Sequence, residues 1–267
     1  MALERPWPVI LLPGGILPAR PAYEALLAEF GNDIDARVKD LEMYAGGTVP
    51  PPDYSLETEV EGIRRVADEA GFDTFHLVGY SAGGASSLAY ASRSPDRLRS
   101  LALMEPAWAG QEGQSPEEAA VFERFRAIPN LSPDRIMPEF VRTQLADGVE
   151  PAQPPPGPPP PGPPPPWMES RLAGIGGFLR AFDAYEPDFE VFRRFERPVY
   201  FALGGRGNPD LYARMATRLG GVFPDFTLEV YDDRHHFDPP HRIEPTRLAA
   251  ALRELWARAE SKDASSI

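Results

Sequence analysis

The pentapeptide Gly-Tyr-Ser-Ala-Gly at residues 79–83 limits the possible folds more than any other stretch of this 267-residue chain. It follows a short apolar, β-rich run at 74–78 and precedes a small, helix-compatible run at 84–91. Its glycines let the backbone turn tightly and leave room beside Ser81. A G-x-S-x-G pattern alone is weak evidence, but its flanks here predict a strand, a sharp turn that carries a serine, and a helix.

Apolar strand candidates alternate with amphipathic helix candidates on both sides of this turn. The expected strands are 8–12, 38–44, 74–78, 98–104, 198–203 and 226–231. The expected helices include 20–30, one that ends at 71, one that ends near 93, 210–219 and 244–259. This alternation predicts an α/β fold with a mostly parallel central sheet that is flanked by helices.

The alternation stops after residue 106 and resumes at 198. Residues 107–197 contain helical patches and no convincing strand, so we expect an inserted helical cap there. The core is expected to consist of residues 1–106 and 198–267. Within the insertion, residues 151–166 are mostly proline, which favours a polyproline II or disordered surface loop.

Composition narrows the possible functions. The net charge is −13, which argues against nucleic-acid or anionic-membrane partners. There are no cysteines, so disulfides, thiol catalysis and thiolate metal sites are excluded. No long apolar run or signal-peptide pattern is visible, so a soluble cytoplasmic protein is expected. No cluster of residues has metal-ligand spacing, and neither a metal nor another cofactor is expected.

The serine turn, the helical insertion after the next strand and a late histidine-rich loop at 232–241 together resemble the α/β-hydrolase superfamily. The resemblance extends over nearly the whole chain apart from the proline-rich run. It implies a catalytic triad in the order serine, acid, histidine. The family commonly begins with an antiparallel hairpin, and this hairpin is expected to be missing here.

The resemblance assigns the nucleophile and the base. Ser81 would be the nucleophile, although a serine at this position can also simply cap a helix. His236 would be the base, because a bulky apolar residue follows it as in the family; His235 is the alternative. Backbone N–H groups of Gly15 and Ala82 would form the oxyanion hole.

The remaining two histidines have other expected places. His241 is expected to have a structural or a substrate-side role. His76 lies inside an expected strand and is predicted to be a packed core residue.

The acid is the least regular part of the pattern. The family's usual position, after the strand at 198–203, holds Asn208, whose neutral side chain cannot stabilise an imidazolium ion electrostatically. Glu105 follows the strand at 98–104, and some members of the haloalkane dehalogenase branch place their acid there. Asp210 is the alternative, and a site without a working acid is the third possibility.

These residues predict hydrolysis of a carboxylic ester or related acyl compound through an acyl-enzyme. Aromatic residues of the insertion suggest an apolar substrate moiety, although most of them are expected to form the core of the cap: Trp108, Phe122, Phe125, Trp167, Phe178, Phe182 and Tyr185. A non-hydrolytic lyase, a perhydrolase or a ligand-binding protein on the same scaffold is the alternative. A third reading is an interaction protein that acts through residues 151–166. The natural substrate and the oligomeric state are not indicated.

Overall fold

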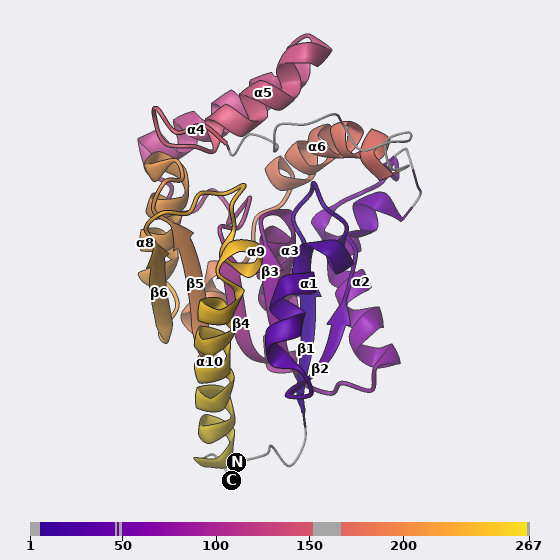
Figure 1. Cartoon of the computed structure of the whole chain (residues 1–267), viewed down its shortest axis with the longest axis vertical. Coiled ribbons are helices and arrows are strands. Elements are labelled where there is room, and N and C mark those ends of the chain that lie inside the picture. Colours follow the sequence, from indigo (N-terminus) through magenta and orange to yellow (C-terminus); the bar gives the residue numbers. More distant parts are fainter. Residues whose placement is uncertain (1–5, 46, 48–49, 152–166, 266–267) are drawn as a thin grey trace.

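A computed structural model describes residues 6–45, 47, 50–151 and 167–265. Six strands form one sheet in the order β2-β1-β3-β4-β5-β6, and each neighbouring pair is parallel (Figure 1). The strands are β1 (Trp7–Leu12), β2 (Ile34–Val38), β3 (Phe75–Tyr80), β4 (Leu98–Met104), β5 (Val199–Gly204) and β6 (Phe226–Tyr231). The predicted α/β fold with a parallel central sheet is confirmed. Among the described residues no strand precedes β1, and β2 forms the edge of the sheet.

One strand prediction was wrong. A strand was expected at 38–44, but β2 ends at Val38 and residues 42–44 form a short 3₁₀ helix, η1 (Glu42–Tyr44). Leu41 and Met43 caused the error, because they are apolar and buried, yet they reach the core from a turn. β2 itself is an edge strand of intermediate burial, so its apolar signal is weak.

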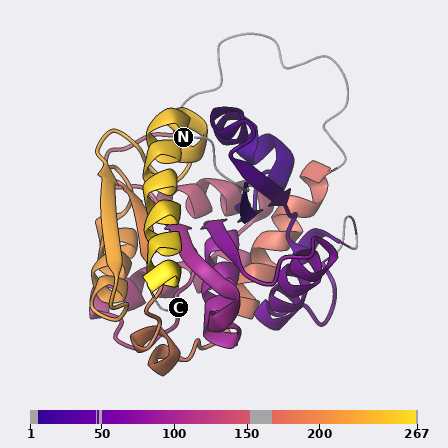
Figure 2. The ribbon, with the colours of Figure 1, turned by 90° about the horizontal axis from the view of Figure 1, so that it is seen from below.

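Helices cover both faces of the sheet (Figure 2). The helices of the two layers are α1 (Ala19–Phe30), α2 (Leu56–Glu69), α3 (Ala82–Arg93), the π-helix η4 (Pro209–Ala213), α8 (Arg214–Gly220), α9 (Pro240–Ile243) and α10 (Pro245–Ser265). Alternate residues of β1 face opposite layers: Val9 belongs to the cluster with α1 and α10, and Ile10 to the cluster with α2 and α3. This two-sided burial explains why β1 is apolar without interruption.

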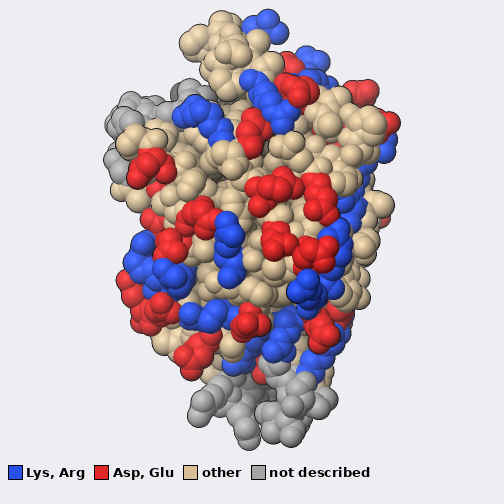
Figure 3. Space-filling model, turned by 180° about the vertical axis from the view of Figure 1, so that it is seen from behind, with Lys and Arg blue, Asp and Glu red and all other residues tan. Residues whose placement is uncertain are grey.

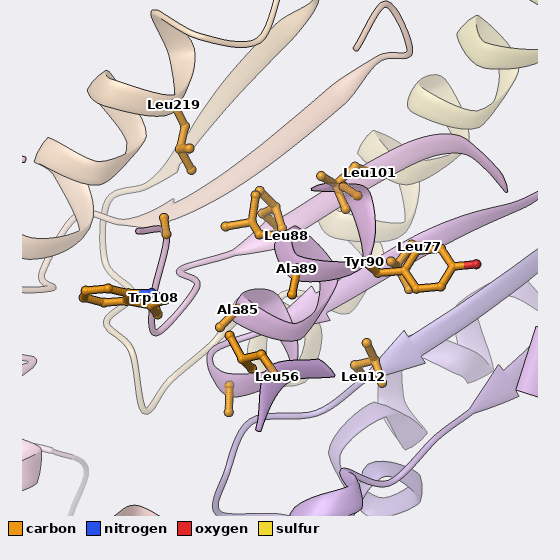
Figure 4. Close-up of a cluster of buried hydrophobic side chains, with 14 of the residues drawn as sticks. Leu12, Leu56, Leu77, Ala85, Leu88, Ala89, Tyr90, Leu101, Trp108 and Leu219 are labelled. Carbon is orange, nitrogen blue, oxygen red and sulfur yellow. The ribbon is translucent and has the colours of Figure 1, made fainter. Parts of the chain in front are cut away.

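The helix that follows the serine turn is held tightly against the sheet. Side chains of α3, including Ala85 and Leu88, pack beside Leu77 of β3 and Leu101 of β4 (Figure 4). All residues from Ala82 to Ser92 of α3 are buried. The small side chains at its start therefore let the helix approach the strands closely.

Four α-helices of the described residues come between β4 and β5 in the chain, and the first three lie over the carboxyl ends of the strands (Figure 1). They are α4 (Pro116–Ala127), α5 (Pro133–Thr143), α6 (Trp167–Asp183) and α7 (Phe189–Arg193). We call this part, residues 107–197, the helical insert; its division from the core as a separate cap remains a prediction. The proline-rich loop predicted at 151–166 lies, beyond residue 151, outside the described residues. No helix in the described part of the chain is long and apolar enough to cross a membrane.

Candidate active site

Ser81 occupies a strained turn between β3 and α3. Its φ angle is 53°, a left-handed value that non-glycine residues rarely adopt. The backbone is held on both sides, because its N–H donates to the Met104 carbonyl at 3.0 Å and its carbonyl accepts from the N–H of Ala107 at 2.9 Å. A Cβ on Gly83 would lie 2.5 Å from the carbonyl oxygen of Leu12, so only glycine fits there. The turn therefore forms as the sequence predicts.

Glu105 lies in a similar turn at the end of the neighbouring strand. Its φ angle is 43°, and among the described residues only Ser81 and Glu105 are non-glycine residues with positive φ. Tyr80 of β3 is in register with Met104 of β4, so the two turns lie side by side at the same edge of the sheet. Such conformations cost about 1–3 kcal/mol each and are concentrated at functional sites.

His236 joins these two side chains. Its Nε2 lies 3.0 Å from Ser81 Oγ, and its Nδ1 lies 2.9 Å from Glu105 Oε2. The other carboxylate oxygen of Glu105 accepts the backbone N–H of Gly204 at 2.8 Å. A carboxylate beside Nδ1 favours the tautomer that carries its proton there, which leaves Nε2 free to accept the serine hydroxyl proton. All three side chains belong to nearly buried residues, with exposures of 8% for Ser81, 2% for His236 and 5% for Glu105.

The alternative residues are not brought into this chain of hydrogen bonds. His235 accepts the N–H of Phe237 at its own Nδ1, 3.2 Å away, and burial lowers its pKa. Asp210 accepts from Arg214 Nε at 2.9 Å, one turn further along. The structure therefore brings together Ser81 and His236 without His235 or Asp210.

Asn208 has a different partner from the one its position in the family suggests. Its Nδ2 donates to the carbonyl of Thr143 at 2.8 Å, and its Oδ1 accepts the N–H of Asp210 at 3.0 Å. Its backbone N–H donates to the Gln144 carbonyl at 3.0 Å. The side chain therefore ties the end of α5 to the loop after β5, while the carboxylate beside His236 comes from Glu105.

Two tyrosines that the sequence did not single out hold the His236 ring. The ring of Tyr212 stacks on the imidazole, with centroids 4.7 Å apart and planes 6° apart, and its hydroxyl donates to Gln144 Oε1 at 2.7 Å. The hydroxyl of Tyr80 donates to the backbone carbonyl of His236. Burial, and after it Glu105, raises the pKa of both tyrosines well above the usual value, so both remain donors. No sequence signal identifies Tyr212, because its partners lie far away in the chain.

The two predicted oxyanion-hole residues both border the cavity at Ser81. Ala82 is the first residue of α3, where a helix has no internal partner for its N–H. The carbonyl of Gly15 accepts the Tyr44 hydroxyl at 2.6 Å, which holds the loop after β1 in place. Burial raises the pKa of Tyr44 to about 12, so this donor stays protonated. The roles of Gly15 and Ala82 remain predictions.

A cavity opens beside Ser81 and His236, with about 930 Å³ of space free of protein atoms, open solvent at its entrance included. The helical insert supplies one aromatic wall, with Phe122, Phe125, Phe140, Phe178 and Phe182. Trp108 and Tyr185 are instead buried together, and the Trp108 Nε1–H donates to the Tyr185 carbonyl at 2.8 Å. The side chain of Trp167 lies outside the described residues.

The remaining predictions concern histidine and metals. His76 is fully buried in β3, as expected of a core residue, and its Nδ1 lies 2.8 Å from Ser100 Oγ. In the described part of the chain no three histidine or carboxylate side chains are arranged to hold a metal ion.

Comparison with known proteins gives the same fold. A model of the alpha/beta hydrolase fold family matches residues 31–150. A Caulobacter segnis protein named "Putative carbamate hydrolase RutD" is 38% identical over 56 residues, which is 21% of this chain and only about a fifth (21%) of that protein.

Solved structures of two enzymes superpose over almost the whole chain. A membrane phospholipase A has a TM-score of 0.70 at 17% identity, covering 97% of this chain and 81% of the other. An esterase from Thermogutta terrifontis has a TM-score of 0.63 at 18% identity, covering 96% and 91%. The resemblance to the α/β-hydrolase superfamily is thus confirmed, and the chain is a protein of the α/β-hydrolase fold.

Proposed function

We propose that this protein is a serine hydrolase that cleaves a carboxylic ester or a related acyl compound. The observation that supports this best is the continuous hydrogen-bonded series from Ser81 Oγ through the His236 ring to the Glu105 carboxylate. Ser81 and His236 in this series line a cavity whose other walls are largely apolar, as is usual for a small-molecule site. A nucleophile, a base within reach and a group that orients the base are what acyl transfer to serine requires.

In the first half of the proposed reaction, Ser81 Oγ attacks the substrate carbonyl carbon while His236 Nε2 takes its proton. The N–H groups of Gly15 and Ala82 donate to the oxygen that becomes negative. His236 then gives the proton to the leaving alcohol, and the acyl group stays on Ser81 as an ester. In the second half, His236 activates a water molecule that releases the acid and restores the free serine.

Glu105 supports both halves through charge and orientation. Its carboxylate accepts the Nδ1–H of His236, so it stabilises the imidazolium ion that forms when Nε2 takes a proton. The N–H of Gly204 holds the second carboxylate oxygen and prevents rotation of the group. Glu105, which directly follows β4, therefore supplies the negative charge that the neutral Asn208 side chain lacks.

The helical insert is proposed to act as a cap that receives an apolar part of the substrate. Its phenylalanines face the cavity, and transfer of an apolar group from water to such a wall is favourable by roughly 25 cal/mol per Å². The insert is fastened to the core beside the catalytic histidine, through Asn208 and through Gln144.

The test is turnover of short p-nitrophenyl esters together with labelling by a fluorophosphonate. We expect hydrolysis, and a stoichiometric mass increase on the peptide that contains Ser81, and we expect both to disappear in Ser81→Ala. Binding of acyl compounds without turnover or labelling would contradict the proposal and favour a ligand-binding protein. Serine-dependent release of products without uptake of water would instead indicate lyase chemistry.

A further inference from the structure

Most polar side-chain atoms around the cavity already have partners within the protein. Ser81 and His236 bond to each other, and the Tyr80 hydroxyl bonds to a backbone carbonyl. Both ends of the Gln144 amide are used, since Oε1 accepts from Tyr212 and Nε2 donates to the Phe140 carbonyl at 2.8 Å. These groups shape the site, but they have little capacity left to recognise a polar substituent of a substrate.

Two neighbouring residues of α9 are exceptions. Arg242 is exposed, and its side chain forms no hydrogen bond or ion pair with any described residue. Arg242 is also the one charged residue, apart from the histidines, among the described residues that line the cavity. His241 lines the same cavity, is fully buried, and neither of its ring nitrogens has a hydrogen-bond partner in the described part of the chain.

Arg242 differs from an arginine that precedes it in the chain. Figure 3 shows the side of the molecule opposite to that of Figure 1, on which α9 lies, and there basic and acidic side chains are interspersed. On the loop before α9, Arg234 already has partners: Nε lies 3.0 Å from Glu244 Oε1, and a guanidinium nitrogen lies 3.7 Å from Asp238. In a protein with a net charge of −13, a cation without a carboxylate partner beside the cavity provides a local attraction for an anion that the protein as a whole does not provide.

The buried ring of His241 is also consistent with an anion that binds at this side of the cavity. Its ring lies against the rings of Tyr23 and Tyr80, with centroid distances of 4.9 and 4.8 Å. Burial, followed by the charges of Arg242 and His236, lowers its pKa to about 3, so the ring is neutral at physiological pH. A neutral imidazole still has one N–H to donate, and a buried donor without a partner is rare in folded proteins. An acceptor from a bound molecule would satisfy it.

We propose that Arg242, with His241 beside it, binds a carboxylate of the substrate. The preferred substrate is then an acyl compound whose apolar part fills the aromatic wall and whose carboxylate lies near the opening, where Arg242 is exposed. The inference rests on the proposed hydrolase function and narrows it to one substrate class. A guanidinium recognises a carboxylate through two parallel N–H···O bonds, which gives selectivity over a neutral group of equal size.

The first test compares two esters of similar length, p-nitrophenyl pentanoate and mono-p-nitrophenyl succinate. Wild-type protein is expected to have the higher kcat/KM for the succinate ester at low salt, and this preference should decrease as salt is added. Arg242→Gln is expected to lower the ratio of the two kcat/KM values by about tenfold, the effect of a lost charge-assisted pair at a partly exposed site. Arg242→Lys should lower it less, because the charge remains.

The matched control is Arg135→Gln, which removes the same charge from an exposed arginine of α5 that does not line the cavity. Its ester ratio should equal that of the wild type. If Arg242→Gln behaves like this control while the neutral ester is hydrolysed, the inference is wrong and the hydrolase proposal stands.

Calorimetry with pentanoate tests the same contact without turnover. Wild-type protein should bind this carboxylate about tenfold more tightly than Arg242→Gln does, and Arg135→Gln should match the wild type. Arg242-dependent binding in a protein that cleaves neither ester would support the inference and overturn the hydrolase proposal. Equal binding by wild type and Arg242→Gln would overturn the inference whatever the turnover.

Discussion

The described part of the chain contains two sets of serine, histidine and glutamate side chains that lie close together, and the set at Ser81 adjoins the cavity described above. The second set lies away from the carboxyl ends of the strands. There His76 Nδ1 lies 2.8 Å from Ser100 Oγ, and His76 Nε2 lies 3.5 Å from Glu260 Oε1. His76 belongs to β3, Ser100 to β4 and Glu260 to α10. The residue types are those of the proposed active site, so residue type alone does not define the site.

The two sets differ in the backbone conformation at the serine and in the access of the serine to the cavity. Ser100 lies within a strand and is fully buried, and neither it nor His76 lines the cavity. Ser81, in contrast, sits just past a strand end, in a left-handed turn beside the cavity. The orientation of the ring also differs, because the serine contacts Nδ1 in one set and Nε2 in the other. A strand end supplies a turn that presents the side chain, which the middle of a strand cannot do.

The sharpest test of this contrast removes each serine. Ser81→Ala should lower kcat by about 10⁴- to 10⁶-fold, because a catalytic serine and its base act as a unit. Ser100→Ala should leave kcat within a few-fold of the wild type and lower the free energy of unfolding by about 1–3 kcal/mol, because a buried nitrogen of His76 loses its partner. Steady-state kinetics and urea denaturation measure the two effects. A folded Ser100→Ala protein without turnover would contradict the assignment of the sites.

The next test removes each carboxylate charge. Glu105→Gln should lower kcat by about 10³- to 10⁴-fold, the effect of losing the triad acid in serine proteases. Glu260→Gln should change kcat little, because this carboxylate lies on α10 and does not contact His236. Near-normal turnover of Glu105→Gln would mean that another group stabilises the imidazolium ion.

A third test asks whether a carboxylate after β5 can replace the one after β4. Asn208→Asp should lower the free energy of unfolding by about 1–3 kcal/mol, because a carboxylate oxygen would replace the Nδ2 donor that faces the Thr143 carbonyl. The same change made in Glu105→Gln should not restore turnover, since the side chain at 208 is directed to α5. Recovery of turnover in the double variant would show that this loop can turn toward His236.

The smallest expected effect concerns the pH dependence of the second set. His76, whose Nε2 lies 3.5 Å from the Glu260 carboxylate, and after it Arg99 lower the pKa of Glu260 from 4.5 to about 2. A carboxylate whose pKa is lower in the folded than in the unfolded protein stabilises the fold at pH values above its unfolded-state pKa. This contribution is lost as the pH falls from about 4.5 to 2. The Glu260 side chain is 39% exposed, so solvent weakens its interactions. At pH 7 the free energy of unfolding of the wild type should therefore exceed that of Glu260→Gln by under about 1 kcal/mol. Urea unfolding at pH 7 and at pH 3 should show this difference shrinking; a constant difference would contradict it.

Much of the fold follows from local sequence. The alternation of apolar strands and amphipathic helices predicts the parallel sheet, and the turn at 79–83 predicts where the serine lies. The turn is predictable because its glycines meet a local steric requirement: a Cβ on Gly79 would lie 2.4 Å from the carbonyl oxygen of Gly83. The prediction of a strand at 38–44 was wrong for the opposite reason. Leu41 and Met43 are apolar because they pack into the hydrophobic core, and they do not belong to a strand.

The partners within the site depend on contacts between distant segments. His235 and His236 are neighbours in sequence and nearly equally buried, yet only the second faces Ser81. The position of the loop that carries them is set by its packing on the end of β5, where a Cβ on Gly204 would lie 2.7 Å from the Arg234 carbonyl oxygen. No pattern within the loop itself contains that information.

By itself the sequence determined the α/β fold, the serine turn and a short set of candidates for the base and the acid. Tertiary structure decided that Glu105 faces His236, that Asn208 is bonded to the helical insert, and that Arg242 lines the cavity without a hydrogen-bond or ion-pair partner among the described residues. The physical reason is the sequence separation of the interacting residues. Turns and periodic burial depend on neighbours a few residues away, whereas these pairings join side chains up to 131 residues apart, which meet only once the sheet has formed.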